Sequence, residues 1–151
     1  MNSDTVGNRT KVVLDTNILI SGVGFKGSPR EILSLVLDDK ITAITSPVLL
    51  AELREVIFKK FPKLVIQLAI MEERIKEKFL IVSPKETLNL VRDKDDNRVL
   101  EAAVEGNCDY IVTGDLDLLE LKQYKRIKIV TPTDFLEIFN NRLDSKTKCT
   151  T

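Results

Sequence analysis

Short runs of apolar, often β-branched residues alternate with longer helix-like segments along most of this chain. Single runs of this kind fit strands that are buried on both faces, and the segments between them are long enough to be the crossovers that parallel strands need. The predicted strands are residues 11–15, 41–45, 79–84, 110–114 and 127–131. The alternation therefore predicts an α/β fold, in which a central parallel sheet has helices on both faces.

The segments between the strands carry helix start and stop signals. Ser28 and Ser46 are each followed by a proline, which is typical of an N-cap residue before the first helical position, and Glu31 would complete a capping box with Ser28. Gly106 is expected to be a C-terminal stop. The predicted helices are residues 28–39, 46–60, 63–78, 96–106 and 133–143.

Length and charge limit the class of protein. The 151 residues predict one domain over residues 11–142, with disordered tails at 1–10 and 143–151. Lys and Arg number 23 and Asp and Glu also number 23, so any contact with nucleic acid must depend on a local patch. No apolar run is long enough to cross a bilayer, and the polar N-terminus does not look like a signal peptide. A cytoplasmic protein without a membrane partner is expected.

Two residue types are informative by their scarcity. The chain has no histidine, which excludes histidine acid/base catalysis and imidazole metal sites. Its two cysteines, Cys108 and Cys149, are far apart in the sequence, so neither a disulfide framework nor a thiolate zinc site is expected. Any metal or acid/base chemistry must depend on carboxylates.

Acidic residues fall where several predicted strands end. Asp15 ends the first strand, Asp115 directly follows the run 110–114, and Asp117 comes soon after it. Asp96 begins the helix that leads into that strand, and Glu52 lies at the border of the apolar face of the helix after residues 41–45. Because ligands bind beyond the carboxyl ends of parallel strands, these acids are expected to gather in one pocket.

Each acid also has a simpler explanation. Asp15 and Asn17 are common turn residues, and Asp96 could be only an N-cap. Glu52 could be a solvated helix charge, and Asp115 could follow only a glycine turn. The joint pattern favours the pocket, because four separate segments would otherwise end on acids at the same edge by coincidence.

A pocket of carboxylates needs compensation. Two carboxylates 4 Å apart repel by about 4 kcal/mol at an effective dielectric constant near 20. Either some of them bind a proton or a divalent cation lies among them. All-oxygen ligands select hard ions such as Mg²⁺ or Mn²⁺. Such an ion activates a water and stabilises charge on a phosphate oxygen, which suits phosphodiester hydrolysis without histidine.

The ordered motifs resemble a known family. The stretches "VVLDTNILISG", "SPVLLAELREVI", "DKDDNRVLEAAVEGNCDYIVTGDLDLLEL" and "IVTPTDFL", spread over roughly residues 11–139, resemble PIN-domain ribonucleases. The resemblance is greatest to the branch described as toxins of toxin–antitoxin pairs. It implies a PIN-like three-layer sandwich with about five parallel strands in the order 3-2-1-4-5.

The resemblance also implies a site. Its catalytic and metal-binding acids would be Asp15, Glu52, Asp96 and Asp115, with Asp117 as an additional acid. Asn17 and Thr113 match polar supporting positions that would orient the carboxylates by hydrogen bonding. Asp93 or Asp95 could take the place of Asp96 if the register slips.

The implied reaction is cleavage of single-stranded RNA by a water activated by one or two Mg²⁺ or Mn²⁺ ions, with Glu52 binding metal or accepting the proton. Lys26, Arg30, Arg54 and Arg98 are candidates for contacting the RNA backbone. An antitoxin protein would be a partner, and the apolar stretch 64–71 fits a homodimer interface.

Two other classes remain open. A Mg²⁺-dependent phosphatase also gathers aspartates at a sheet end, but the haloacid-dehalogenase type would require an acid where Asn17 stands. A non-catalytic protein- or RNA-binding module of the same fold would use the stretch 64–71 as its working surface. Binding of Mn²⁺ separates the nuclease from the module.

Overall fold

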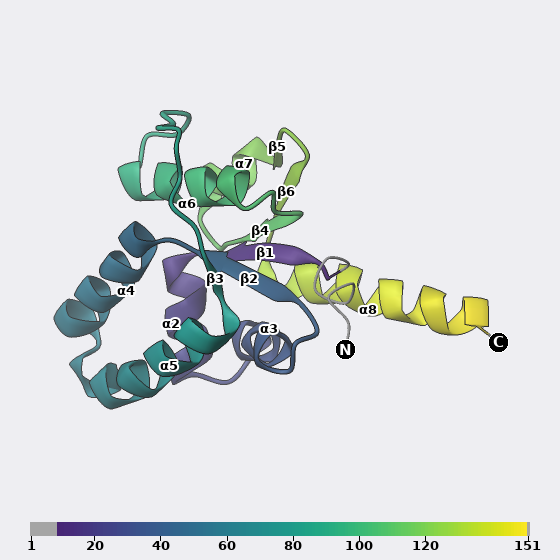
Figure 1. The fold of residues 1–151 in the computed structure, drawn as a ribbon, viewed down its shortest axis with the longest axis horizontal. Coiled ribbons are helices and arrows are strands. Elements are labelled where there is room, and N and C mark those ends of the chain that lie inside the picture. The colour runs from purple at the N-terminus through teal and green to yellow at the C-terminus, as the bar shows by residue number, and fades with distance from the viewer. Residues whose placement is uncertain (1–8, 151) are drawn as a thin grey trace.

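The computed structural model describes residues 9–150, so residues 1–8 of the tail predicted over 1–10, and Thr151, lie outside the described residues. A six-stranded sheet with the order β3-β2-β1-β4-β6-β5 forms the centre of the protein (Figure 1). Its strands are β1 (Lys11–Leu14), β2 (Thr42–Thr45), β3 (Leu80–Ile81), β4 (Tyr110–Val112), β5 (Gln123–Tyr124) and β6 (Ile127–Val130). All neighbours pair in parallel except β5, which pairs antiparallel with β6.

This sheet confirms the predicted α/β fold and its strand order. The fifth predicted strand is β6, which lies beside β4 as expected. The short edge strand β5 was not predicted, because two residues are too few to show a period-2 pattern.

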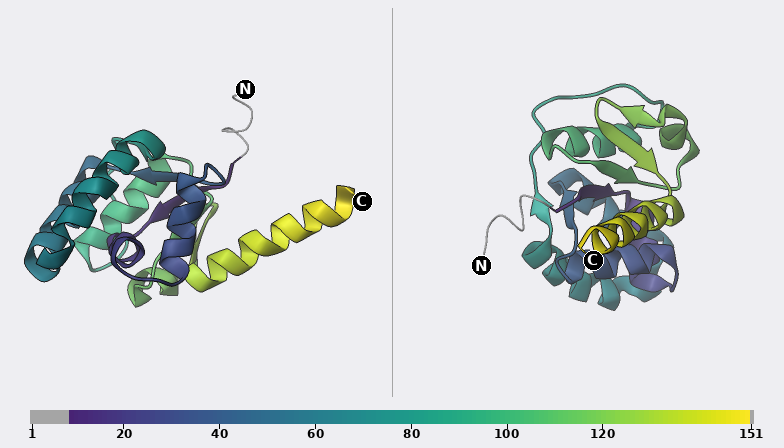
Figure 2. Two further views of the ribbon diagram at one scale, coloured as in Figure 1. Left: turned by 90° about the horizontal axis from the view of Figure 1, so that it is seen from below. Right: turned by 90° about the vertical axis from the view of Figure 1, so that its right-hand side faces the viewer.

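Helices cover both faces of the sheet. α6 and α7 lie on one face, and α2, α3, α5 and α8 lie on the other (Figures 1 and 2). The helices are α2 (Thr16–Gly24), α3 (Ser28–Leu37), α4 (Pro47–Lys60), the 3₁₀ turn η1 (Pro62–Leu64), α5 (Val65–Lys78), α6 (Lys94–Glu105), α7 (Leu116–Leu121) and α8 (Pro132–Thr150).

Alternate residues of each central strand enter different cores. Val12 and Leu14 pack with α2, α3, α5 and α8, whereas Val13 packs with α6 and α7 on the other face. α4 contributes to both cores, because Leu53 lies in the first and Leu49 in the second. This position at the border of the two layers brings α4 close to the carboxyl ends of the strands.

The two predicted helix starts have different outcomes. Ser46 is the N-cap of α4, and its side chain accepts a hydrogen bond from the Leu49 N–H. The capping box at Ser28 is wrong, because Gly27 is the N-cap of α3 and Ser28 is already helical. The backbone turns into α3 at φ 137° at Gly27, a conformation that favours glycine over serine.

The ends of α6 also differ from the prediction. The helix begins at Lys94 with Asp93 as its N-cap, so Asp96 lies inside the first turn and not at the cap. Gly106 does end the helix, but its backbone is right-handed (φ −84°). A Cβ atom at Gly106 would lie 2.9 Å from Ile44 Cγ2, so this glycine is needed for close packing against β2.

Three helical segments exceed what the sequence predicts. α2 follows Asp15 directly, and α7 follows Asp115 directly; neither was predicted. α8 runs to Thr150 and so includes residues 143–150, which the sequence predicts to belong to a disordered C-terminal tail. Neither proline nor glycine follows Leu143 to end this helix, which extends away from the rest of the protein (Figure 2).

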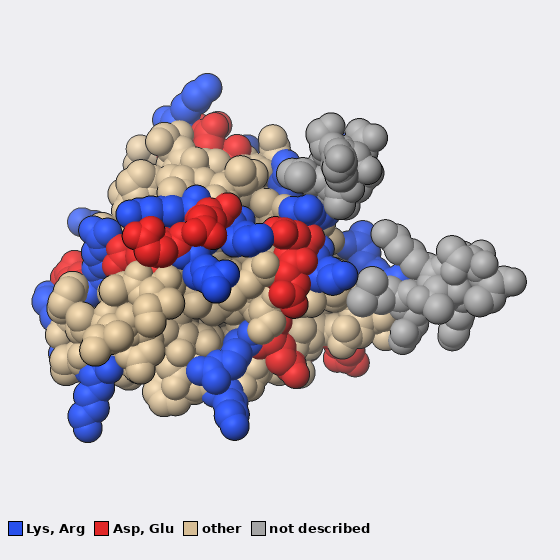
Figure 3. Space-filling view, turned by 60° about the horizontal axis from the view of Figure 1, so that its bottom comes forward, with Lys and Arg blue, Asp and Glu red and all other residues tan. Residues whose placement is uncertain are grey.

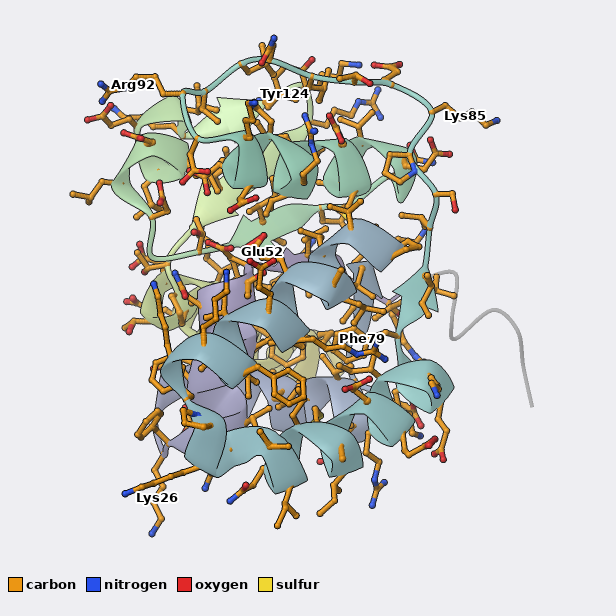
Figure 4. The ribbon with its side chains drawn as sticks, turned by 90° about the vertical axis from the view of Figure 1, so that its left-hand side faces the viewer. Lys26, Glu52, Phe79, Lys85, Arg92 and Tyr124 are labelled. Carbon is orange, nitrogen blue, oxygen red and sulfur yellow. The ribbon has the colours of Figure 1, made fainter. Side chains whose placement is uncertain are left out.

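The segment 82–93, here called the strap, has almost no regular secondary structure and crosses over α6 between Lys85 and Arg92 (Figure 4). Side chains of α6 hold its backbone. Asn97 accepts hydrogen bonds from the Leu90 and Val91 N–H groups at 2.9 and 3.1 Å and donates to the Val91 carbonyl at 2.9 Å. The strap therefore leads the chain into the start of α6 at a fixed register.

None of the helices within the described residues combines the length and the apolar character that a membrane span requires.

Candidate metal centre

Asp15 is held at the end of β1 by a hydrogen bond from another strand. Asp15 precedes α2 at the N-cap position, yet its side chain does not cap that helix. Instead the buried Thr113 hydroxyl, which follows β4, donates to Asp15 Oδ2 at 2.7 Å. The same hydroxyl accepts from the Asp115 N–H at 3.0 Å. One side chain thus fixes two of the predicted acids relative to each other.

Three acids lie close enough to share one cation. Asp96, Asp115 and Asp117 each have a carboxylate oxygen within 4.8 Å of those of the other two. Asp96 is 5% exposed and enters this group from α6, while Asp115 and Asp117 come from the start of α7. Asp115 Oδ1 accepts from the Asp117 N–H at 2.9 Å, which leaves the other oxygen of Asp115 free of that contact.

Glu52 approaches the same acids from α4. Its side chain projects from α4 toward α6 (Figure 4). Burial, followed by the negative charges of Asp95 and Asp15, raises the pKa of Glu52 to about 7. Glu52 is therefore half-buried within the field of the acidic cluster, and is not a solvated helix charge.

The pKa values of the aspartates show the same crowding. Burial raises the pKa of Asp15 despite the hydrogen bond from Thr113, and the charge of Asp115 adds to the increase. Burial and then the charge of Asp115 raise the pKa of Asp96. The acids thus destabilise one another when all are ionised, and a cation or bound protons would relieve this repulsion.

Several buried oxygens of the site have no hydrogen-bond partner. Among the described residues, buried side-chain atoms without a partner include Thr16 Oγ1, Glu52 Oε2 and Asp96 Oδ2, all beside the acidic cluster. Such atoms normally bond to protein, water or an ion, because leaving them unpaired costs free energy. An all-oxygen donor set with orphaned oxygens fits a hard divalent cation such as Mg²⁺ or Mn²⁺.

The comparison with known families agrees with this geometry. The PIN domain family model matches residues 11–117, which include Asp15, Glu52, Asp96, Asp115 and Asp117. The chain belongs to the PIN domain family. The PIN domain here is 35% identical over 148 residues to the uncharacterized protein MJ1680 of Methanocaldococcus jannaschii, covering 87% of this chain and 92% of that protein.

A solved structure supports the fold. The crystal structure of VapBC2 from Rickettsia felis, bound to a DNA fragment from their promoter, matches with a TM-score of 0.59 and 21% identity. The match covers 80% of this chain and 97% of that one. At this identity the likeness concerns the PIN fold alone.

The structure of this PIN domain sorts the predicted acids and their supports. Asp96, and neither Asp93 nor Asp95, joins Asp115 in the group that could hold a cation. Asp117 completes that group, although it was predicted only as an additional acid. Asp15 and Glu52 lie beside the group but outside the set of three, and the negative charge of Asp15 raises the pKa of Glu52.

The two supporting residues of the PIN domain differ. Thr113 makes the hydrogen bonds that its predicted role requires. Asn17 is exposed, and among the side-chain hydrogen bonds of the described residues none joins it to a carboxylate. Thr16 and Leu116 are each adjacent to a predicted acid but were not themselves predicted as site residues.

Most of the predicted RNA-binding cations have partners within the protein. Arg30 donates to the Gly22 and Val23 carbonyls near the end of α2. Arg54 pairs with Glu72 of α5, and Arg98 pairs with Glu101 and donates to a strap carbonyl. Lys26 is exposed and lies at the lower edge of the molecule in Figure 4, well away from Glu52 near the centre. The geometry favours none of the four as an RNA contact.

Proposed function

We propose that this PIN domain is a metal-dependent endoribonuclease that hydrolyses phosphodiester bonds of single-stranded RNA. The main support for this proposal is that carboxylate oxygens of Asp96, Asp115 and Asp117 lie within 4.8 Å of one another. Asp15 and Glu52 lie beside this group. None of the ion pairs among the described residues neutralises these acids. Members of the PIN domain family are generally nucleases, which supports the same reaction class.

The acids have separate roles in this proposal. Asp96, Asp115 and Asp117 would hold one or two Mg²⁺ or Mn²⁺ ions, with Asp15 as a further ligand through the oxygen that Thr113 does not bond. When bound, the ion lowers the pKa of a water and stabilises negative charge on a phosphate oxygen. Glu52, with its pKa near 7, is suited to accept the proton of the attacking water on a carboxylate oxygen.

We also propose the biological setting. The resemblance to toxins of toxin–antitoxin pairs, together with the fold shared with VapBC2, supports a toxin that has an antitoxin protein as its partner and acts in the cytoplasm. A homodimer through α5 is supported by Ile66 and Ile70, which are 74% and 62% exposed on that helix. Light scattering with Ile70→Ser tests this. If the dimer forms through α5, the variant should be monomeric at protein concentrations at which wild type is still dimeric.

The reaction is tested with single-stranded oligoribonucleotides in Mg²⁺, Mn²⁺ or EDTA. Wild type should cleave only with metal, and Asp96→Asn or Asp15→Asn should stay folded yet lose about 100-fold or more in rate. Asp134→Asn, an exposed acid on α8, is the matched control and should cleave normally. Cleavage in EDTA, or by Asp96→Asn, would contradict the assigned site.

Two results would favour the other classes. If calorimetry detects no Mn²⁺ binding by wild type, a non-catalytic binding module becomes the better explanation. If the protein hydrolyses phosphomonoesters and leaves RNA intact, the phosphatase is favoured.

A further inference from the structure

A pocket of about 570 Å³ opens directly beside the acidic cluster. On one side it is lined by Asn17, Ile18 and Ser21 of α2, and on the other by Asp115, Leu116 and Asp117 at the start of α7. Its wall therefore shares two acids with the candidate metal centre, so whatever occupies the pocket would lie next to an ion held there.

The charge of the pocket limits its occupant. Two carboxylates line it, and among the described residues no Lys or Arg side chain does. A phosphate inside the pocket would be repelled by Asp115 and Asp117 and would find no cationic side chain there. The occupant must instead be an uncharged group that is attached to the phosphate at the metal centre.

Leu116 gives the pocket an apolar lip. It is the first residue of α7 and is 75% exposed, whereas Leu118 of the same helix is fully buried in the core. Single exposed leucines are common, but this one stands between two acids of the candidate site and lines the pocket. Ile18, 7% exposed, adds apolar surface on the side of α2.

Asn17 and Ser21 give the same pocket hydrogen-bonding capacity. The Asn17 amide offers donors and an acceptor, and the Ser21 hydroxyl offers both. Asn17 is exposed and makes none of the side-chain hydrogen bonds found to the neighbouring carboxylates, so its amide is available to a ligand. Apolar faces combined with amide and hydroxyl groups match a nucleobase, which has a flat apolar face and a polar edge.

We propose that this pocket binds one nucleobase of the RNA strand next to the phosphate at the acidic cluster, with Leu116 against the base face and Asn17 against its edge. The proposal rests on the nuclease function proposed above. It makes Leu116 a determinant of substrate affinity and accounts for the proposed preference for single strands, because an unpaired base enters a pocket without the cost of breaking a base pair.

The test is Leu116→Ser, with Leu90→Ser as the matched control at an exposed position of the strap. In cleavage of a fluorescent oligoribonucleotide with Mn²⁺, Leu116→Ser should raise KM about tenfold, as expected for loss of one leucine contact, and leave kcat within about twofold. Calorimetric Mn²⁺ affinity should stay unchanged, and Leu90→Ser should behave like wild type.

A second measurement identifies the base as the ligand. Fluorescence anisotropy in Ca²⁺ measures the affinity of the protein for the intact oligoribonucleotide and for a set of strands, each of which lacks the base at one position. One abasic position should weaken binding by wild type about as much as Leu116→Ser weakens binding of the intact strand. That abasic strand should then bind wild type and Leu116→Ser equally, since the shared contact is lost in both.

The outcomes separate the two proposals. Cleavage by wild type with an unchanged KM in Leu116→Ser would overturn the base pocket and leave the nuclease standing. Binding that depends on Leu116 without any metal-dependent cleavage would support the pocket and overturn the nuclease. If wild type neither binds nor cleaves the strand, both proposals are wrong.

Discussion

At the scale of single residues, the Thr113 hydroxyl controls how two acids meet. It has one proton, which it donates to Asp15, and a lone pair that accepts from the Asp115 N–H. Thr113→Val keeps the shape and removes both bonds, so Asp15 becomes free to turn and the Asp115 N–H loses its partner. Mn²⁺ affinity, measured by calorimetry, should fall about 10–100-fold.

The same variant should also unfold more easily, by about 1–3 kcal/mol, because a buried donor and acceptor are left unpaired. Thr133→Val, at an exposed position of α8, is the matched control and should change neither quantity. Unchanged Mn²⁺ affinity in Thr113→Val would mean that Asp15 does not need this hydrogen bond to serve the site.

Glu52 should make the metal-free protein sensitive to pH. Its pKa is about 7 in the folded protein and about 4.5 as the ordinary value, so the folded state binds its proton more tightly between these limits. The free energy of unfolding should therefore fall as pH rises through this window. Glu52→Gln removes the charge. Because solvent screens this half-exposed side chain, the variant should be only about 1 kcal/mol more stable than wild type at pH 8.

In thermal unfolding with EDTA, the Tm of Glu52→Gln should be about 2–4 °C above that of wild type at pH 8 and equal to it at pH 4. Glu55→Gln on the same helix is the control of opposite sign, because its hydrogen bond with Lys59 lowers the pKa of Glu55. A gain for Glu52→Gln that is equal at both pH values would show that the charge of Glu52 is not responsible.

At the scale of elements, Asn97 joins α6 to the strap. Its buried amide makes three hydrogen bonds to the backbone of Leu90 and Val91. Asn97→Ala should lower the free energy of unfolding by about 1–3 kcal/mol, since these backbone groups lose their partners. In Asn97→Ala, hydrogen–deuterium exchange at the Leu90 and Val91 amides should be faster than in wild type, while exchange at the β1 amides should not change as much. This difference would show that the strap opens locally.

Asn89→Ala is the matched control, because Asn89 lies in the same strap with an exposed side chain. It should leave both the stability and the exchange of Leu90 unchanged. If Asn97→Ala exchanges like wild type at Leu90, the strap is held by its other contacts, such as the bond from the Leu88 N–H to Glu101.

The elements that could be predicted from the sequence are those with a strong local pattern. β1 and β4 are short branched runs buried on both faces, and Ser46-Pro47 marks the start of α4 by a cap whose hydrogen bond is present. α2 lacks such a pattern, because its sequence TNILISGVG contains two glycines and several β-branched residues, and most of its residues pack inward. Tertiary packing, and not propensity, makes it helical.

The site was predictable in its residue types but not in its grouping. Asp15, Asp96 and Asp115 could be found because each stands next to a strand end or a helix start. That Asp117 completes the group of three depends on α7, which turns the chain directly after Asp115 and was not predicted. The sequence predicts Asn17 as a support of the acids, but α2 carries its side chain to the pocket wall.

At the scale of the whole molecule, charge is distributed without a dominant sign. The numbers of acidic and basic residues are equal, and on the face shown in Figure 3 the Lys and Arg side chains alternate with Asp and Glu. Long-range electrostatic attraction of an RNA would therefore be weak, and in the proposed nuclease the affinity would have to come from the ion and from short-range contacts such as the pocket.

The ion would also stabilise the whole domain. Asp96 comes from α6, whereas Asp115 and Asp117 follow β4, so an ion held by these three acids would tie together separate segments of the chain. Binding to the folded state alone adds about 2.7 kcal/mol at a metal concentration of 100 times Kd, which is about 5–10 °C in Tm.

Asp96→Asn should lose this shift and, with EDTA, should be more stable than wild type, because a buried mutual repulsion is removed. Asp134→Asn is the control and should keep the full shift with Mg²⁺ or Mn²⁺. Equal metal-induced shifts in wild type and Asp96→Asn would place the ion elsewhere in the protein.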